Sequence, residues 1–130
     1  MEFEKQVCGL ELAKRLKEWG IRQESLFRWL RTENTWFVAP MLATPDALIN
    51  HGEWYSAFTV AELGELLPWQ YQVLKAETPS MGQYLGYKID LKNHTFEVLA
   101  SSGVIADTEA DARAKMLIYL LENKLLEVGK

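Results

Sequence analysis

The sequence predicts an α+β fold: a two-layer sandwich in which an antiparallel sheet of about four to five strands carries helices on one face. Three segments have the apolar stripe of an amphipathic helix, and each therefore needs only one buried face. Between them lie short aromatic and β-branched runs that are separated by polar turns of hairpin length. The chain has 130 residues and shows no repeat or linker, so we expect a single domain over residues 1–130.

Composition and charge restrict the class of protein. Hydrophobic residues make up 48% of the chain and charged residues 25%, as in globular proteins. The net charge of −4 disfavours a general coat for nucleic acid or an anionic membrane surface. Cys8 is the only cysteine, so no intramolecular disulfide can form, which fits a reducing compartment. The sequence shows neither a secretory signal nor an apolar run of the roughly 20 residues that a membrane helix needs. We therefore expect a cytoplasmic protein.

The first predicted helix covers residues 5–19 and ends at a glycine, the residue type that best stops a helix. We expect Cys8 to be a small buried or half-buried residue within this helix and not a nucleophile. The apolar stripe of the helix consists of Cys8, Leu12, Leu16 and Trp19. The charged residues off this stripe are Lys14, Arg15, Lys17 and Glu18.

The next stretch, ESLFRWL at residues 24–30, allows two structures. As a strand it places Phe27 and Trp29 on one face and Arg28 on the other. As a helix it follows a glycine turn and completes a helix-turn-helix over residues 12–31, an arrangement found in many small DNA-binding proteins. A helix at residues 24–30 would favour a DNA-binding regulator, whereas a strand there would favour another function.

The residues that follow favour the strand. The polar letters TEN lead into TWFVAP, an aromatic and β-branched run, and two such runs joined by a short polar turn are typical of a β-hairpin. We therefore predict that residues 25–30 form a strand paired with residues 35–39. A recognition helix is further disfavoured because Glu24, near its start, would face the DNA phosphates.

The middle of the chain predicts a loop, a short strand and a helix. Residues 40–53 contain two prolines, which indicates a long surface loop, and such loops are often functional. Residues 54–58, WYSAF, form a short strand or pack the loop onto the core. Thr59 and Glu62 then have the spacing of a capping box, and Pro68 ends the helix that they begin.

The second half of the chain predicts more strands and the clearest helix. YQVLKAET is a strand, QYLGYKIDL and HTFEVLA form a hairpin around the turn KN, and VIAD adds a few paired residues. Thr108 caps the last helix, with Asp111 at the capping-box position. The apolar stripe of this helix consists of Ala110, Ala114, Leu117, Ile118, Leu121 and Leu125.

Residues that could carry catalysis are few. His51 lies in the predicted loop and His94 in a hairpin turn, and neither belongs to a recognised zinc motif. No glycine-rich phosphate loop and no GxSxG string is present. The acidic residues Asp107, Glu109 and Asp111 lie where carboxylates stabilise a helix N-terminus, which explains them better than a metal site does. We predict no catalytic residues, no metal and no cofactor, which disfavours an enzyme.

The aromatic residues are the one unusual feature of the sequence. All five tryptophans lie between residues 19 and 69. Filling the core of a small sheet is the simpler interpretation of these aromatics. The alternative is an interaction surface beside the predicted loop, because rings with a polar tip are favoured at interfaces. The candidate binding residues of this surface are Trp36, Trp54, Tyr55, Arg28 and Arg31.

Three strings, LELAKRLKEWGIRQESLF, SAFTVAELGELLP and TEADARAKMLIYLLENKLL, resemble in this order a group of small uncharacterised proteins of phages, prophages and conjugative elements of Gram-positive bacteria. The resemblance covers about half of the chain. It implies an accessory protein of a mobile element. It implies no activity and no site residues, and it does not extend to residues 31–53.

These observations favour a non-enzymatic interaction module that binds a host protein, a phage protein or a second copy of itself. The first alternative is a DNA-binding regulator that uses a helix-turn-helix at residues 12–31. The second is an enzyme whose site is not visible in one sequence. Nucleic acid is the less favoured partner, and no membrane is expected. The backbone conformation of residues 23–31 distinguishes these hypotheses, because the regulator requires a helix there and the interaction module does not.

Overall fold

The computed structural model describes residues 3–32, 35–40, 54–68, 71–75, 84–90, 92, 95–98 and 105–126. Its helices are α1 (Phe3–Gln6), α2 (Leu10–Glu18), α4 (Val60–Leu66) and α5 (Glu109–Glu122). Its strands are β1 (Phe27–Thr32), β2 (Thr35–Pro40), β3 (Trp54–Ser56), β4 (Tyr71–Lys75), β5 (Tyr84–Asp90), β6 (Thr95–Val98) and β7 (Ile105–Ala106). The α+β class is confirmed. Of the predicted loop over residues 40–53, Pro40 ends β2, and the remainder lies outside the described residues, as do both histidines.

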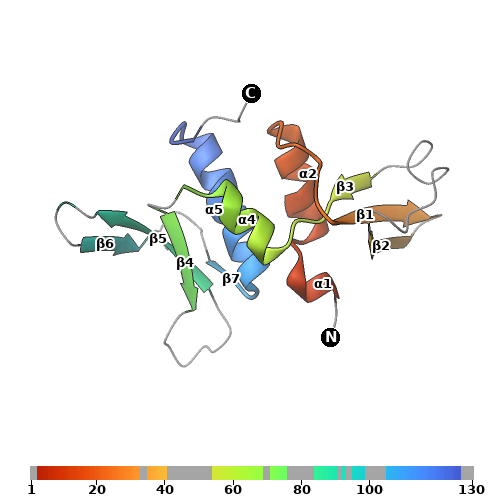
Figure 1. Ribbon diagram of the computed structural model, residues 1–130, viewed down its shortest axis with the longest axis horizontal. Coiled ribbons are helices and arrows are strands. Elements are labelled where there is room, and N and C mark those ends of the chain that lie inside the picture. Colours follow the sequence, from red (N-terminus) through yellow and green to blue (C-terminus); the bar gives the residue numbers. More distant parts are fainter. Residues whose placement is uncertain are drawn as a thin grey trace.

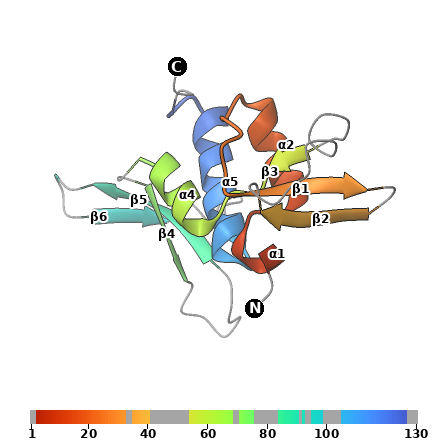
Figure 2. The same ribbon diagram turned by 45° about the vertical axis from the view of Figure 1, so that its right-hand side comes forward.

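The described strands form two antiparallel sheets, whereas the sequence predicted one sheet of four to five strands. The first sheet has the order β2-β1-β3, and the second has the order β4-β5-β6 with β7 also paired to β5. The strands divide because β3 returns to β1, after which α4 carries the chain away before β4 begins (Figure 1). Helices α4 and α5 lie between the two sheets in both views (Figures 1 and 2), and α2 packs against α5 and β3.

Helix α5 is the centre of the core. It contacts α2 and α4 as well as β4, β5 and β7, so it is covered on several sides and not along a single stripe. Its buried residues are Ala110, Ala112, Ala114, Met116, Leu117, Ile118, Leu120 and Leu121. Leu125, which the predicted stripe included, lies beyond the end of the helix and is 51% exposed. The helix is therefore shorter and more deeply enclosed than its apolar pattern indicated.

The N-terminal helix is interrupted, contrary to the single helix predicted over residues 5–19. Val7 pairs with Thr59 as an isolated antiparallel bridge, and the Cys8 amide donates to the Phe58 carbonyl at 2.9 Å. These long-range bonds hold the backbone of residues 7–8 extended between α1 and α2. Cys8 is buried, as predicted, but it lies between two helices and not within one.

Gly9 is the N-cap of α2, and its amide donates to Asp111 Oδ1 at 2.6 Å. The Thr108 hydroxyl accepts from the Asp111 amide at 3.1 Å, so Thr108 caps α5 as predicted. The Asp111 carboxylate instead connects the first turns of two helices that are 102 positions apart in the sequence. The carboxylate of Asp111 therefore has a structural role, which is to join the starts of α2 and α5.

We expect Asp111→Ala to lower the free energy of unfolding by about 1–3 kcal/mol, because it removes the acceptor of a part-buried amide. The matched control is Asp107→Ala, which changes the charge equally at an exposed position just before the same helix and should cost under about 0.5 kcal/mol. Urea unfolding of both variants measures the difference. Equal, small losses would contradict the role assigned to the Gly9 contact.

The backbone of residues 21–26 is non-helical, and β1 follows directly. A strand here is confirmed, although it spans Phe27–Thr32 and so begins two residues later than predicted. Its partner is β2, with Phe27 opposite Pro40 and Thr32 opposite Thr35. The second helix of the alternative helix-turn-helix at residues 12–31 is therefore absent, and that prediction is wrong. The cause is a set of contacts with α4.

Glu62 of α4 makes those contacts. Its carboxylate accepts from the Thr59 amide at 2.9 Å while Thr59 accepts from the Glu62 amide at 3.2 Å, which confirms the predicted capping box. The same carboxylate accepts from the Ser25 hydroxyl at 2.7 Å and from the Leu26 amide at 2.9 Å. The Ser25 hydroxyl oxygen also lies 2.9 Å from the Ala57 carbonyl oxygen, which is a second possible acceptor for its single proton. Residues 25 and 26 are thus held against the start of α4, which excludes a helix there.

Burial raises the pKa of the Cys8 thiol from an ordinary 9.0 to about 12, and desolvation is the largest cause. The thiol is therefore protonated at neutral pH and is not an activated nucleophile. The raised pKa means that the folded state holds this proton more strongly than the unfolded state. The stability contribution of Cys8 is therefore complete below about pH 9 and is lost as the pH rises toward 12.

We expect Cys8 in the folded protein to react with an aromatic disulfide reagent at pH 8 far more slowly than in the urea-unfolded chain. The side chain is 0% exposed, so the reaction requires opening of the structure. Absorbance of the released thiolate measures both rates. Equal rates would show that the backbone between α1 and α2 opens freely.

Candidate functional site

All five candidate binding residues lie on the first sheet. Arg28 and Arg31 are on β1, the central strand, while Trp36 is on β2 and Trp54 and Tyr55 are on β3. The strand register explains how residues so far apart in sequence come together. Arg31 is opposite Trp36 across the β1–β2 pair, and Leu30 and Trp29 are opposite Trp54 and Tyr55 across the β1–β3 pair.

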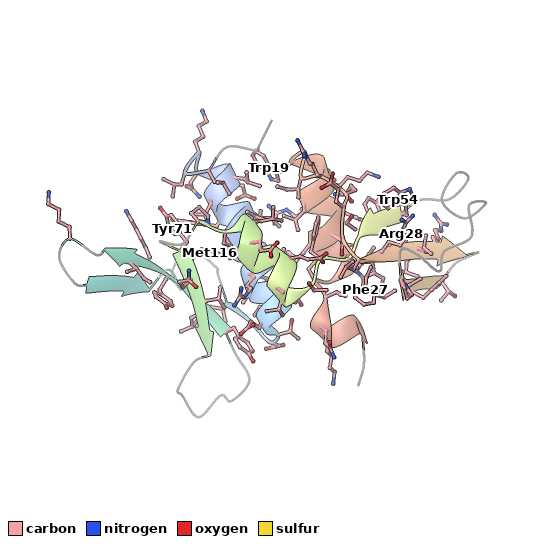
Figure 3. The ribbon with its side chains drawn as sticks, in the orientation of Figure 1. Trp19, Phe27, Arg28, Trp54, Tyr71 and Met116 are labelled. Atoms are coloured by element: carbon pink, nitrogen blue, oxygen red, sulfur yellow. The ribbon has the colours of Figure 1, made fainter. Side chains whose placement is uncertain are left out.

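Alternation along the strands divides these residues between two faces of the sheet. Trp36 and Tyr55 share a face, and their ring centroids are 5.7 Å apart with planes tilted by 36°. Because β1 lies between β2 and β3, these two side chains reach toward each other across the central strand. Arg28 and Trp54 share the other face, where the Arg28 guanidinium carbon is 4.5 Å from the Trp54 ring centroid. Figure 3 shows both of these side chains at the end of the molecule formed by the first sheet.

Helix α2 adds two cations that the sequence interpretation had assigned only to the solvent side of a helix. Lys14 Nζ is 5.4 Å from the Trp36 ring centroid and 5.9 Å from that of Tyr55. Lys17 Nζ is 5.1 Å from the ring centroids of both Trp54 and Tyr55, and it donates to the Trp54 carbonyl at 3.1 Å. These distances are in the range of cation–π attraction.

Six residues from four elements thus form one group, which we name the aromatic–basic cluster: Lys14, Lys17, Arg28, Trp36, Trp54 and Tyr55. The i,i+3 spacing of the two lysines, which places both on one side of a helix, was the only signal in the sequence that could have included them. Arg31, the remaining candidate, is exposed on β1 opposite Trp36 and lies beside the cluster.

Arg28 is the most unusual member of the aromatic–basic cluster. It is only 2% exposed, and an arginine side chain carries its charge at any pH that a protein experiences. Its Nε and Nη1 atoms are buried and have no hydrogen-bond acceptor among the described residues. Desolvation by burial lowers the pKa of this guanidinium. Burying a charged group with two unpaired donors is costly, and the contact with the Trp54 ring compensates only part of that cost.

The rest of the fold holds the first sheet firmly. Trp29 of β1 donates through its indole nitrogen to the Cys8 carbonyl at 3.0 Å, and the Ala57 amide donates to the Phe27 carbonyl at 3.0 Å. The Ser56 amide donates to the Gln23 side-chain oxygen at 2.7 Å. The aromatic–basic cluster is therefore carried by strands that are fixed to the helical core and not by a free hairpin.

The part of the chain that the structure describes shows neither a metal-binding group nor a membrane-spanning helix. Those residues contain no group of three or more His, Cys, Asp or Glu side chains placed to hold a metal ion. None of the described helices combines the length and the apolar character that crossing a membrane requires. Two acidic residues near the start of α5 have structural partners. Asp111 accepts from the Gly9 amide, and Glu109 Oε2 lies 3.6 Å from Arg113 Nη2.

Comparison of the chain with protein-family models, with curated proteins and with solved structures found no match.

Proposed function

We propose that this protein is a non-enzymatic interaction module that binds a partner protein through the aromatic–basic cluster of its first sheet. The observation that carries the proposal is the convergence of three aromatic rings and three cations from α2, β1, β2 and β3. Aromatic and arginine side chains dominate the binding energy of protein interfaces. A cluster that combines them on a rigid sheet has the composition of such a site.

The exposure of the three rings fits this role. Trp36, Trp54 and Tyr55 are all half-buried, so each keeps a surface that a partner could cover. The lysines that contact them leave their ammonium groups near the surface, as do the polar residues at the rim of many interfaces. A ring placed only to fill the core would be fully enclosed. The aliphatic side chain of Leu30, also on β1, is enclosed in this way.

We further propose that the module acts in the cytoplasm as an accessory protein of a phage or conjugative element of Gram-positive bacteria, with a host or phage protein as its partner. The three strings quoted above support this origin by their resemblance to such proteins. The single buried cysteine fits a reducing compartment. Regulation of DNA through residues 12–31 is not proposed, because β1 occupies the place of the second helix.

The test is affinity capture from a Gram-positive host lysate with three purified forms of the protein: wild type, Trp36→Ala, and Trp19→Ala as the matched control. Trp19 is 40% exposed at the end of α2 and lies away from β2 (Figure 3), so its loss changes the aromatic surface elsewhere. We expect a protein that wild type and Trp19→Ala retain and that Trp36→Ala loses.

Calorimetry with that purified partner should then show binding at least about tenfold weaker for Trp36→Ala, the loss expected of an aromatic residue central to an interface. Circular dichroism establishes that each variant is folded. Capture of the same proteins by all three forms would overturn the proposal, as would equal losses for the two tryptophan variants.

A further inference from the structure

We infer that the Arg28 guanidinium is the anchor of an anion site within the aromatic–basic cluster, and that the site takes a carboxylate of an acidic polypeptide. This inference rests on the proposed function, because it names the chemistry of the partner. It starts from the two donor nitrogens of Arg28 that have no acceptor among the described residues. Arginine is the side chain best suited to bind a carboxylate, because its donors have the matching planar geometry.

Trp54 holds the Arg28 guanidinium in place without using its donors. The ring contacts the guanidinium at 4.5 Å from the centroid, and a cation over a ring is attracted through the ring face. The N–H groups of the guanidinium point outward in its own plane and are not consumed by this contact. A positioned guanidinium with unused donors can bind an anion with little reorganisation of its own. Because Nε and Nη1 are buried, the anion reaches them by displacing the side chains that cover them.

Lys17 makes the surroundings of Arg28 more positive, whereas Lys14 adds positive charge over the rings on the other face of the sheet. Lys17 is 5.1 Å from the same Trp54 ring, so it lies close to Arg28 around one aromatic side chain. Lys14 is 3.7 Å from Glu11 Oε1, but the Glu11 side chain is 85% exposed, and such a surface pair contributes little. In a chain with a net charge of −4, this surface favours a negatively charged partner by charge complementarity.

The occupancy of the ring faces favours a carboxylate over a single-stranded nucleic acid. Nucleic acid binds such surfaces by stacking its bases on open aromatic faces. Here Lys14 lies over Trp36 and Tyr55, Lys17 lies over Trp54 and Tyr55, and Arg28 lies over Trp54. A base would have to displace these cations, whereas a carboxylate binds their N–H groups and leaves the ring contacts intact. The acidic polypeptide is therefore the occupant that the geometry favours.

The test measures fluorescence anisotropy of a labelled deca-glutamate peptide against the 130-residue chain, with labelled deca-thymidine as the second probe. Wild type is compared with Arg28→Met, Lys17→Gln and the matched control Lys88→Gln. Lys88 is exposed on β5 of the other sheet (Figure 1), so its loss changes the net charge equally at a distance from the site. Low salt is used because surface charges are screened less under those conditions.

Arg28→Met should bind the peptide at least about tenfold more weakly, the loss expected when charge-assisted hydrogen bonds disappear. The affinity of Lys17→Gln for the peptide should fall a few-fold, and that of Lys88→Gln should equal the wild-type affinity. The wild-type protein should bind deca-thymidine at least about tenfold more weakly than the peptide. The melting temperature of Arg28→Met should equal or exceed that of wild type, because methionine removes a buried charge without leaving a polar group unpaired. A purely structural arginine would give a lower melting temperature.

Three results would overturn the inference: no binding of the peptide by wild type, equal binding by Arg28→Met and Lys88→Gln, or tighter binding of deca-thymidine. If Arg28→Met fails to fold, that also assigns Arg28 a structural role and overturns the anchor. Lys17→Gln then tests whether the peptide binds at this cluster at all. If the wild-type protein does not bind the peptide but still captures a partner through Trp36, the carboxylate site is refuted and the proposed function is not. If the wild-type protein binds the peptide but captures no partner that depends on Trp36, the proposed function is refuted and the carboxylate site is not.

Discussion

Leu117→Ala should lower the free energy of unfolding by about 2–5 kcal/mol, the usual cost of truncating a fully buried leucine. Leu117 is 0% exposed and lies in the helix that contacts both neighbouring helices and the second sheet. Its neighbours on the predicted stripe, Ile118 and Leu121, are nearly as buried and should show losses in the same range. A domain of this size has a total stability of only about 5–15 kcal/mol, so each variant should melt at a clearly lower temperature.

The control for these three variants is Lys124→Ala. Lys124 is exposed just beyond the end of α5, with a φ of 57°, a conformation that lysine and alanine disfavour alike. It should therefore change stability by less than about 0.5 kcal/mol. Thermal and urea unfolding of all four variants measure the pattern. Small and equal effects at every position would show that α5 is not the centre of the core.

The core of α5 could be predicted because it depends on local information. An apolar residue at every third or fourth position indicates a buried helical face whatever surrounds it. The pattern did not show that other faces of the helix are buried as well, since alanines such as Ala112 fit an exposed position equally well. Their burial follows from the packing of α2 and α4 against α5, and that packing depends on residues about 50 to 100 positions away.

The break between α1 and α2 and the division into two sheets are long-range effects of the same kind. Nothing in the local sequence around Cys8 and Gly9 indicates that Phe58 and Asp111 will bind their amides. The pairing of β3 with β1 is set in three dimensions, and this pairing separates the first sheet from the second. Local patterns therefore predicted most elements correctly and their assembly only in part.

The candidate site shows the same limit. The sequence singles out the aromatic residues because their concentration beside a predicted loop is unusual. Arg28 is a candidate binding residue beside them, but its burial against Trp54 has no signal in the sequence. Lys14 and Lys17 were assigned only to a solvated helix face, since a cation–π contact leaves no pattern along the chain. The unpaired donors of Arg28 could not be predicted either, because alternation along a strand gives the face of a side chain and not its hydrogen-bond partners.

Glu62→Ala should lower the free energy of unfolding by about 2–4 kcal/mol. The capping box alone accounts for only part of this loss. Thr59→Ala removes the hydroxyl that accepts from the Glu62 amide but leaves the Glu62 carboxylate in place, so it should cost about 1 kcal/mol. The additional loss in Glu62→Ala comes mainly from the Leu26 amide, which loses its acceptor at 2.9 Å. The Ser25 hydroxyl loses the charged acceptor at 2.7 Å and keeps only the Ala57 carbonyl.

Glu65→Ala provides the matched control, because Glu65 is exposed on the same helix and its loss changes the net charge equally. It should cost less than about 0.5 kcal/mol. Urea unfolding gives the order of the three losses, and amide hydrogen exchange at Leu26 reports whether the start of β1 has been released. Exchange at Leu26 should accelerate in Glu62→Ala and remain near wild type in Thr59→Ala. Glu62 holds residues 25 and 26 in a conformation that excludes the second helix of a DNA-binding motif, and a Glu62→Ala variant no less stable than Thr59→Ala would contradict that role.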